Sequence, residues 1–274
     1  MQDRKFSMAN KPRLSYSDFW PKLTCDYGFA TVLVILAKSN KITDNLMSPE
    51  RFARINQLLD QRQPDLTLVL ENLQKQHNLS ALVRSADAVG IHAVHAIWLD
   101  RRGRMSKGVA AGSQKWVKVH HHDSTEAAIS AVKQQGMQVL VTNLSERAVD
   151  FRSIDYTRPT AILMGQERQG VTAEALALAD HEIIIPMVGM VESLNVSVAA
   201  ATVLYEAQRQ RANAGMYQQP RLAEAERQRV LFEGGHPIFA RICQRIGLAY
   251  PALDEAGQIV ADEAWWQTIR AAGR

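Results

Sequence analysis

The sequence predicts an α/β protein in which a mostly parallel sheet is flanked by helices. Short runs of β-branched and other apolar residues recur along the chain and are typical of buried strands. Segments with apolar residues at helical spacing lie between these runs. Strands that alternate with helices in this way favour a parallel sheet built from strand–helix–strand units.

The first expected helix covers residues 49–62. Ser48 precedes it as an N-cap, and Pro49 takes the first helical position, where a backbone N–H is not needed. Apolar residues share one face of this segment, and Pro64 prevents the helix from continuing. These start and stop signals agree, so we expect a well-defined helix here.

The remaining elements follow in alternation. The expected strands are residues 66–70, 92–99, 116–120, 138–142, 160–164 and 182–185. The expected helices are residues 79–89, 125–135 and 173–179, and a long apolar helix that begins near Asn195 and ends at Gly215. Asn78 is expected to cap the helix at residues 79–89. Residues 216–274 are expected to form a helical C-terminal tail.

Residues 1–46 differ from the rest of the chain. They combine polar residues, Pro12, Pro21 and one apolar patch without a sustained period. We expect a poorly ordered extension, and Met47 opens the regular pattern. Two interpretations stay open: an upstream in-frame extension of the natural start, or a genuine flexible arm.

Composition places the chain among ordinary globular proteins. It has 274 residues, of which 46% are apolar and 22% charged, with a formal net charge of +4. The two cysteines, Cys25 and Cys243, lie far apart, which favours a reducing compartment and therefore a cytoplasmic location. No apolar run reaches the roughly 18–20 residues of a membrane span, so no membrane partner is expected. The positive charge permits a polyanionic partner.

Three expected strands end in residues that could form a site. Thr142 and Asn143 follow the strand at 138–142, Gly165 follows the strand at 160–164, and Pro186 follows the strand at 182–185. Ligands of open α/β sheets bind beyond the carboxyl ends of strands. If these strands are parallel neighbours, the three loops line one pocket.

Common nucleotide and metal motifs are absent. Residues 165–170 have the glycine spacing of a P-loop but lack its lysine, and the sequence contains neither GxGxxG nor GxSxG. The histidines at 120–122 have no cysteine or carboxylate partners at ligand spacing, so a solvated strand end is the favoured interpretation over a metal site.

Three segments in order then resemble a known family. Residues 78–84 (NLSALVR), 163–167 (LMGQE) and 184–197 (IIPMVGMVESLNVS) resemble the three motifs of the SpoU branch of the SPOUT methyltransferases. The flanks at 63–67, 150–152, 155–157 and 206–211 narrow the resemblance to the TrmH family of tRNA (guanosine-2′-O-)-methyltransferases, which act on the D-loop guanosine at position 18. The resemblance runs from about residue 47 to residue 217.

The resemblance implies a fold, a cofactor and partners. It implies a deep trefoil knot within residues 47–215, an S-adenosyl-L-methionine pocket formed by that knot, and a homodimer that binds tRNA. By motif match, Thr142, Gly165, Ile185 and Leu194 should contact the cofactor, partly through their backbones. No metal is implied.

The resemblance also implies roles for polar residues, each with a simpler alternative. Arg84 would activate the ribose 2′-hydroxyl, although it could merely pair with Asp87. An arginine has a pKa above about 12, so its role as a base or as an orienting cation stays open. Asn78, Ser193 and Asn195 would position Arg84 and the methionyl end of the cofactor, or only cap helices. Glu167 would hold the substrate or act as a competing base, or is a solvated loop residue.

Basic residues suggest a surface for RNA. The proposed RNA-binding residues are Arg51, Arg54, Arg62, Arg209 and Arg211, with a further basic loop at residues 101–107. A solvated helix face is the alternative. Structured RNA is contacted largely through phosphates and 2′-hydroxyls, which suits arginine. Two other functions stay open: 2′-O-methylation of ribosomal RNA, and RNA binding by a catalytically silent SPOUT fold.

Overall fold

The computed structural model describes residues 47–73, 75–97, 115–166 and 168–273. The described residues from 47 to 262 form one unit, and helix α9 (Glu263–Ala272) belongs to a second. In the described ranges no helix combines the length and the apolar character needed to cross a bilayer. The expectation that residues 1–46 are poorly ordered lies outside the described residues.

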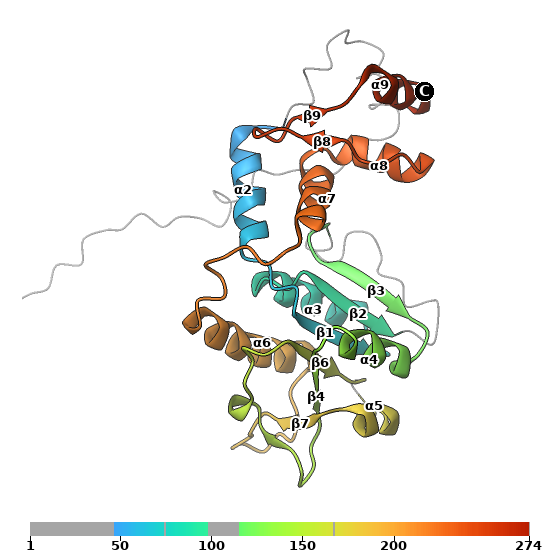
Figure 1. The fold of residues 1–274 in the computed structure, drawn as a ribbon. Coiled ribbons are helices and arrows are strands. Elements are labelled where there is room, and N and C mark those ends of the chain that lie inside the picture. The colour runs from blue at the N-terminus through green and yellow to red at the C-terminus, as the bar shows by residue number, and fades with distance from the viewer. Residues whose placement is uncertain (1–46, 74, 98–114, 167, 274) are drawn as a thin grey trace, which may run out of the picture. The chain divides into compact units, whose positions relative to one another are not determined.

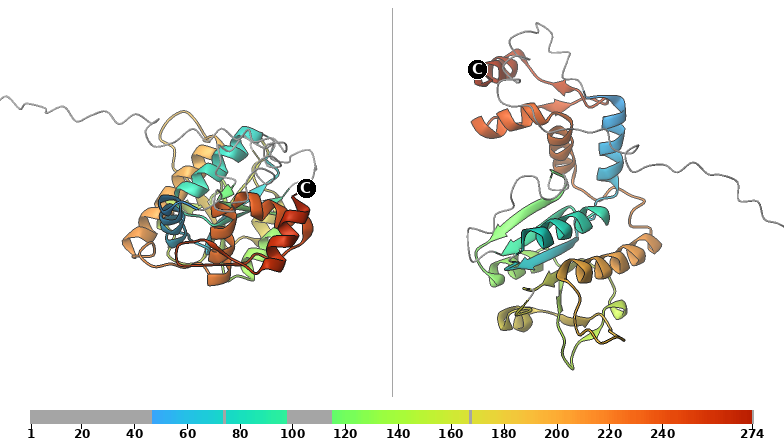
Figure 2. Two further views of the ribbon diagram at one scale, coloured as in Figure 1. Left: turned by 90° about the horizontal axis from the view of Figure 1, so that it is seen from above. Right: turned by 180° about the vertical axis from the view of Figure 1, so that it is seen from behind.

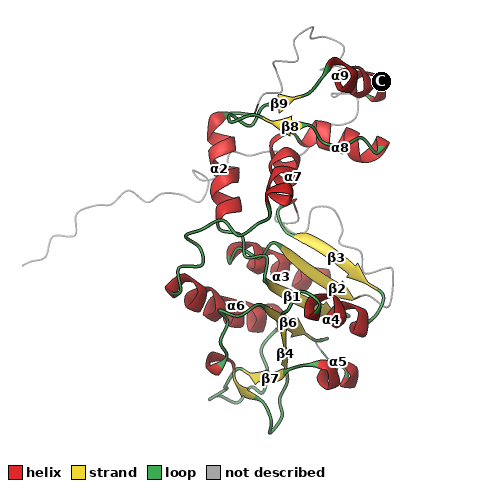
Figure 3. Cartoon of the chain, viewed as in Figure 1, coloured by secondary structure: helices red, strands yellow, loops and turns green. Residues whose placement is uncertain are grey.

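A seven-stranded sheet forms the centre of the first unit (Figures 1 and 3). Its strands are β1 (Leu66–Glu71), β2 (Ala93–Ile97), β3 (Lys118–His122), β4 (Gln138–Thr142), β5 (Val149–Asp150), β6 (Thr160–Met164) and β7 (His181–Ile184). The order is β3-β2-β1-β6-β4-β7-β5, and every neighbouring pair is parallel. The predicted α/β class is confirmed, while the knot stays a prediction.

Helices cover both faces of this sheet. Helices α3 (Gln76–Ala88) and α6 (Val196–Asn213) lie on one face, and α4 (Thr125–Lys133) and α5 (Ala173–Leu178) lie on the other. The same unit also contains α2 (Pro49–Asp60), α7 (Glu224–Gly235) and α8 (Pro237–Ile246). Along β1, Leu66, Leu68 and Leu70 pack with apolar residues of α3 and α6, whereas Val69 packs with those of α4 and α5. This alternation follows from the two-residue period of a strand. Figure 2 shows α3 and α6 together on one face.

Helix α2 packs against the C-terminal tail. Ser48 caps the helix by accepting a hydrogen bond from the Arg51 backbone N–H at 3.3 Å, as the sequence predicts. Ile55 and Leu59 of α2 form a small core with Val230 and Leu231 of α7. The tail also contains a two-stranded ribbon, β8 (Ala252–Leu253) and β9 (Ile259–Val260), which the sequence analysis did not anticipate.

One capping prediction is wrong and another is confirmed. Asn78 does not cap a helix, because α3 begins at Gln76 with Lys75 in the N-cap position. Asn195 caps α6, since its side chain accepts a hydrogen bond from the Ser197 backbone N–H at 2.9 Å. Local sequence could not separate the two, because both asparagines stand beside an apolar helical pattern.

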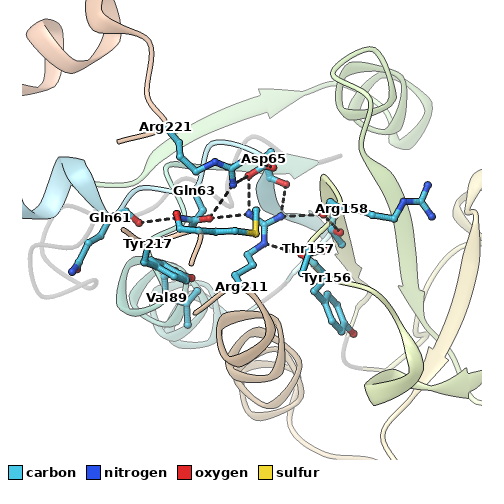
Figure 4. A network of polar contacts seen from close by, with 12 residues as sticks. Gln61, Gln63, Asp65, Val89, Tyr156, Thr157, Arg158, Arg211, Tyr217 and Arg221 are labelled. Carbon is cyan, nitrogen blue, oxygen red and sulfur yellow. Dashed lines mark hydrogen bonds and ion pairs between the residues drawn. The ribbon is translucent and has the colours of Figure 1, made fainter. Parts of the chain in front are cut away.

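A buried arginine joins three parts of the unit (Figure 4). Arg211, near the end of α6, is 0% exposed. Its Nε donates to the Tyr156 carbonyl at 2.8 Å, and its Nη1 donates to Asp65 Oδ1 at 2.7 Å and to Gln63 Oε1 at 3.1 Å. Its Nη2 donates to the carbonyls of Asp65 and Arg158, both at 3.1 Å. All five guanidinium N–H groups are therefore used.

The Asp65 carboxylate also binds Arg221, in the segment that follows α6. Arg221 donates from Nη1 to Asp65 Oδ1 at 2.9 Å and from Nη2 to Asp65 Oδ2 at 3.0 Å. Tyr217 donates its hydroxyl to the Val89 carbonyl at 2.7 Å. The chain that leaves α6 is thus fixed against the start of β1 and the end of α3.

We predict that Arg211→Met destabilises the fold by about 3–5 kcal/mol, because it leaves buried carbonyls and the Asp65 carboxylate without their donor. The measurement is the free energy of unfolding in urea. The control is Arg209→Ala on the same helix, whose side chain is 60% exposed and pairs with Glu206, and which should cost about 1 kcal/mol or less. Equal losses in the two variants would contradict the prediction.

Candidate active site and RNA-binding surface

The three predicted strand ends meet at one edge of the sheet. Strand β4 lies between β6 and β7, with Val141 opposite Leu163 and Thr142 opposite Ile183. Since all three strands are parallel, the residues that follow them emerge on the same side. Thr142, Gly165 and Ile185 are therefore brought together at one edge, as the sequence predicts.

The loop after β6 is folded tightly on itself. A Cβ atom at Gly165 would lie 2.3 Å from the Gly170 carbonyl carbon and 2.5 Å from the Val171 nitrogen, so only glycine fits there. Gln166 and Gly170 exchange both backbone hydrogen bonds at 2.9 Å. Glu167 belongs to this loop but lies outside the described residues, so its predicted role stays a prediction.

Asn78 and Asn195 come together from distant parts of the chain. Asn195 Nδ2 donates to Asn78 Oδ1 at 3.2 Å, while Asn195 Oδ1 accepts from the Ser197 N–H and hydroxyl at 2.9 and 2.6 Å. Asn195 thus caps α6 and also reaches the motif on α3. The capping alternative therefore holds for Asn195, while its role in the site stays a prediction.

Arg84 is exposed on α3, and the alternative that it merely pairs with Asp87 is weakened. The carboxylate of Asp87, its proposed partner, instead accepts from Arg62 Nη2 at 2.7 Å. Ser193 and Leu194 are exposed in the loop that precedes α6. The functional roles of Arg84, Ser193 and Leu194 stay predictions.

A carboxylate that the sequence analysis missed organises the loop after β4. Glu182 on β7 accepts from Asn143 Nδ2 at 2.8 Å and from the Ser145 hydroxyl at 2.6 Å, and pairs with Arg147 at 2.6 Å. These hydrogen bonds, that of Ser145 first, lower the pKa of Glu182 and keep it charged. The signal in the sequence was Asn143 directly after the strand, but its partner lies 39 residues later in the chain, on the neighbouring strand β7.

The prediction of an RNA-binding role is wrong for two arginines, Arg62 and Arg211. Arg62 is 1% exposed and donates to the Ile91 carbonyl at 2.8 Å and the Trp116 carbonyl at 3.0 Å, besides its bond to Asp87. Arg211 is buried in the network of Figure 4. Both guanidinium groups bind carbonyls and carboxylates inside the protein, so neither can reach a phosphate.

The other three arginines are exposed. Arg51 donates to the Gly234 carbonyl at 2.6 Å and 3.1 Å, which links α2 to α7. Arg54 lines a cavity of about 820 Å³ between α2, the end of α3 and α6, away from the strand ends. Arg209 pairs with Glu206. The basic loop at residues 101–107 lies outside the described residues.

The histidines of β3 are less solvated than the sequence suggested. His122 Nε2 lies 2.8 Å from His95 Nδ1 on β2, and the rings of His95 and His120 stack at 5.2 Å. Burial lowers the pKa of His95 to about 4 and also lowers those of His120 and His122. His121 is exposed, whereas His120 and His122 are partly buried. These rings therefore contact one another as neutral groups on the neighbouring strands β2 and β3.

Comparison with known proteins identifies the class and then the family. The fold is that of the SpoU/SPOUT methyltransferases: a crystal structure of the Aquifex aeolicus TrmH/SpoU tRNA modifying enzyme is 41% identical, with a TM-score of 0.65, and the match covers 69% of this chain and 96% of that one. The SpoU rRNA Methylase family model matches residues 65–205, and the model of the C-terminal region of SpoU rRNA methylases matches residues 209–262. The chain belongs to the SpoU methylase family.

Two further proteins are informative. The tRNA (guanosine(18)-2′-O)-methyltransferase of Escherichia coli K12 is 58% identical over 229 residues, which are 83% of this chain and 100% of that protein. The SpoU methyltransferase AviRb of Streptomyces viridochromogenes, solved in complex with the cofactor AdoMet, is 27% identical with a TM-score of 0.50 and covers 55% of this chain and 62% of that one.

We predict that Asn195→Ala lowers the free energy of unfolding by about 0.5–2 kcal/mol, because α6 loses its N-cap. Asn195→Ser keeps a capping oxygen and should recover most of the loss. Urea unfolding measures both, and Ser193→Ala in the same loop serves as the control, with an expected change within about 0.5 kcal/mol. A serine variant as unstable as the alanine variant would refute the capping role.

Proposed function

We propose that this protein transfers the methyl group of S-adenosyl-L-methionine to the ribose 2′-oxygen of guanosine 18 in the D-loop of tRNA. The observation that carries the proposal is the 58% identity to the Escherichia coli enzyme over that enzyme's whole length. The predicted loops follow the neighbouring strands β6, β4 and β7. Asn78 and Arg84 lie on helix α3, and Asn195 lies at the start of helix α6. Substrate and reaction therefore follow from one family assignment.

The strand ends fit the cofactor. S-adenosyl-L-methionine has an apolar adenine ring, ribose hydroxyls and a charged sulfonium amino-acid end. Leu144 in the loop after β4, and Met190 and Leu194 in the loop after β7, are exposed apolar side chains. A Cβ at Gly189 would meet nothing within 4 Å, so this loop leaves open space. Thr142, Gly165, Ile185 and Leu194 would hold the cofactor.

The chemistry needs little from the protein beyond alignment and help with one proton. The bound cofactor supplies the electrophilic methyl group. Arg84 provides a fixed positive charge that holds the 2′-hydroxyl and stabilises the oxygen as its proton leaves. Because an arginine has a pKa above about 12, the proton leaves late, after methyl transfer has begun, or passes to a substrate phosphate. Asn78 and Asn195 join α3 to α6 and fix the helix that carries Arg84.

A homodimer is part of the proposal. Met190 is 100% exposed, and Val188, Val191, Val198 and Tyr205 are also exposed on the same loop and on α6. Monomeric proteins rarely leave a group of large apolar side chains in water beside a binding site. A second copy of this chain would cover them and complete the site near the interface.

Arg51, Arg54 and Arg209 stay as the candidate phosphate contacts on α2 and α6. Residues 47–215 would form the knotted methyltransferase domain, with residues 1–46 as an extension and 216–274 as a tail. A cytoplasmic location follows from the tRNA substrate and from the isolated cysteines.

The test is to map the methylated nucleotide. The purified protein, labelled S-adenosyl-L-methionine and bulk tRNA from a strain lacking the activity should give one 2′-O-methylated guanosine at position 18. Ribosomal RNA from the same strain is the parallel substrate. Label found only in ribosomal RNA would favour the other SpoU activity, and cofactor binding without transfer to either RNA would favour a silent RNA-binding protein.

We predict that Arg84→Ala lowers the single-turnover rate of methyl transfer by about 100-fold or more, the range of a lost acid–base group. Cofactor affinity should stay near wild type, because the strand-end loops hold the cofactor. Arg84→Lys should recover little, since lysine lacks the planar fork that can hold a hydroxyl and a phosphate together.

The control for this measurement is Lys133→Ala on α4, which removes a surface pair with Asp180 on the opposite face of the sheet. Its rate should match wild type at saturating tRNA and cofactor. An Arg84→Ala rate within a few-fold of wild type would remove Arg84 from the mechanism and leave Glu167 as the next candidate.

A further inference from the structure

The end of β1 carries a buried carboxylate that the mechanism above does not use. Glu71 is the last residue of β1 and is 1% exposed. It follows strand residues that are apolar on both faces, and burying a charge there is costly unless hydrogen bonds compensate. The position therefore needs a reason that packing does not supply.

Three hydrogen bonds converge on this carboxylate. The Thr125 hydroxyl donates to Glu71 Oε1 at 2.6 Å from the start of α4. The Thr172 hydroxyl donates to the same oxygen at 2.7 Å, and the Thr172 backbone N–H donates to Oε2 at 3.0 Å. Two of the three donors thus belong to one residue, which is the last residue before α5.

Thr172 ends the loop that begins at Gly165. The Gln166–Gly170 backbone pair closes the middle of this loop, and Thr172 fixes its far end to β1. Near its beginning, Gln166 Nε2 donates to the Asn72 carbonyl, directly after Glu71, at 3.5 Å. The end of β1 therefore contacts the loop both at Gln166, in its closed part, and at Thr172, beyond that part.

Capping of α5 alone does not explain this arrangement. The Thr172 hydroxyl oxygen already accepts from the Ala175 N–H at 3.2 Å, which is a complete N-cap. A cap needs no buried carboxylate behind it. What Glu71 adds is a fixed position for both the hydroxyl and the backbone N–H of Thr172 relative to the sheet.

We propose that Glu71 is a positioning residue that holds the loop at residues 165–172 in the shape that binds the cofactor. The inference rests on the proposed function, because it takes Gly165 as a cofactor contact. Glu71 itself touches neither the cofactor nor the RNA; it acts through Thr172. A loop fixed before binding loses less conformational freedom when the cofactor arrives, which raises affinity.

The experiment separates the hydrogen bonds that Glu71 accepts from Thr172 in the loop from the one that it accepts from Thr125 on α4. Thr172→Val removes the hydroxyl that faces Glu71, whereas Thr125→Val removes a bond of similar length to the same oxygen but on α4. Thr172→Ser restores a hydroxyl. Glu71→Gln replaces two acceptor oxygens by one oxygen and one NH2 group, so either the hydroxyl or the backbone N–H of Thr172 loses its acceptor.

Two readouts are measured on the full chain. Calorimetry with S-adenosyl-L-methionine should show about 10-fold or greater weakening for Glu71→Gln and Thr172→Val, since each loses a hydrogen bond to a charged group. Amide hydrogen exchange without cofactor should accelerate by about 10-fold at residues 165–172 in the same two variants. Thr172→Ser should restore both values, and Thr125→Val should lower stability but change neither.

The outcomes distinguish this inference from the proposed function. Equal losses in Thr125→Val and Thr172→Val, or wild-type affinity in Glu71→Gln, would overturn the positioning role while leaving the methyltransferase assignment intact. A wild-type protein that binds no S-adenosyl-L-methionine would overturn the proposed function. In that case unchanged exchange at residues 165–172 in Thr172→Val would independently overturn the positioning role.

Discussion

The guanidinium group of Arg211 is the contact on which much of this structure depends. It is fully buried, and its five N–H groups donate to residues in two segments. These are Gln63 and Asp65, just before β1, and Tyr156 and Arg158, in the connection that leads into β6. A buried charge is tolerated only when it is paired and hydrogen-bonded throughout. Arg211 near one end of α6 and Asn195 at the other therefore fix a helix that spans from the tail to the site.

The site itself is organised by carboxylates behind its loops. Glu182 accepts hydrogen bonds from Asn143 and Ser145 in the loop after β4. Glu71 accepts hydrogen bonds from Thr172 at the end of the loop after β6. The loop before α6 is instead joined to α3 by the amides of Asn195 and Asn78. Catalysis by alignment requires such support, because a cofactor held by loops is placed only as well as the loops are.

Arginines that are close together in the sequence differ in whether the fold buries or exposes them. Arg54 and Arg62 occur in one helical segment of the sequence, yet the first is exposed beside a cavity and the second is enclosed by carbonyls. Arg209 and Arg211 differ in the same way at the end of α6. A basic run in a sequence therefore overstates the surface available to RNA, because the partners of buried arginines are far away in the chain.

The sequence by itself determined the elements whose signals are local. Strands β4 and β6 lie at their predicted bounds, Ser48 and Asn195 cap the predicted helices, and three ordered motifs indicated the family. Only the tertiary structure decided that Asn78 lies within α3 facing Asn195, that Arg62 and Arg211 are buried, and that Glu71 holds Thr172. The physical reason is range: turns, caps and hydrophobic periods act between neighbours, whereas burial and hydrogen bonding of a long polar side chain depend on segments that meet only in the folded chain.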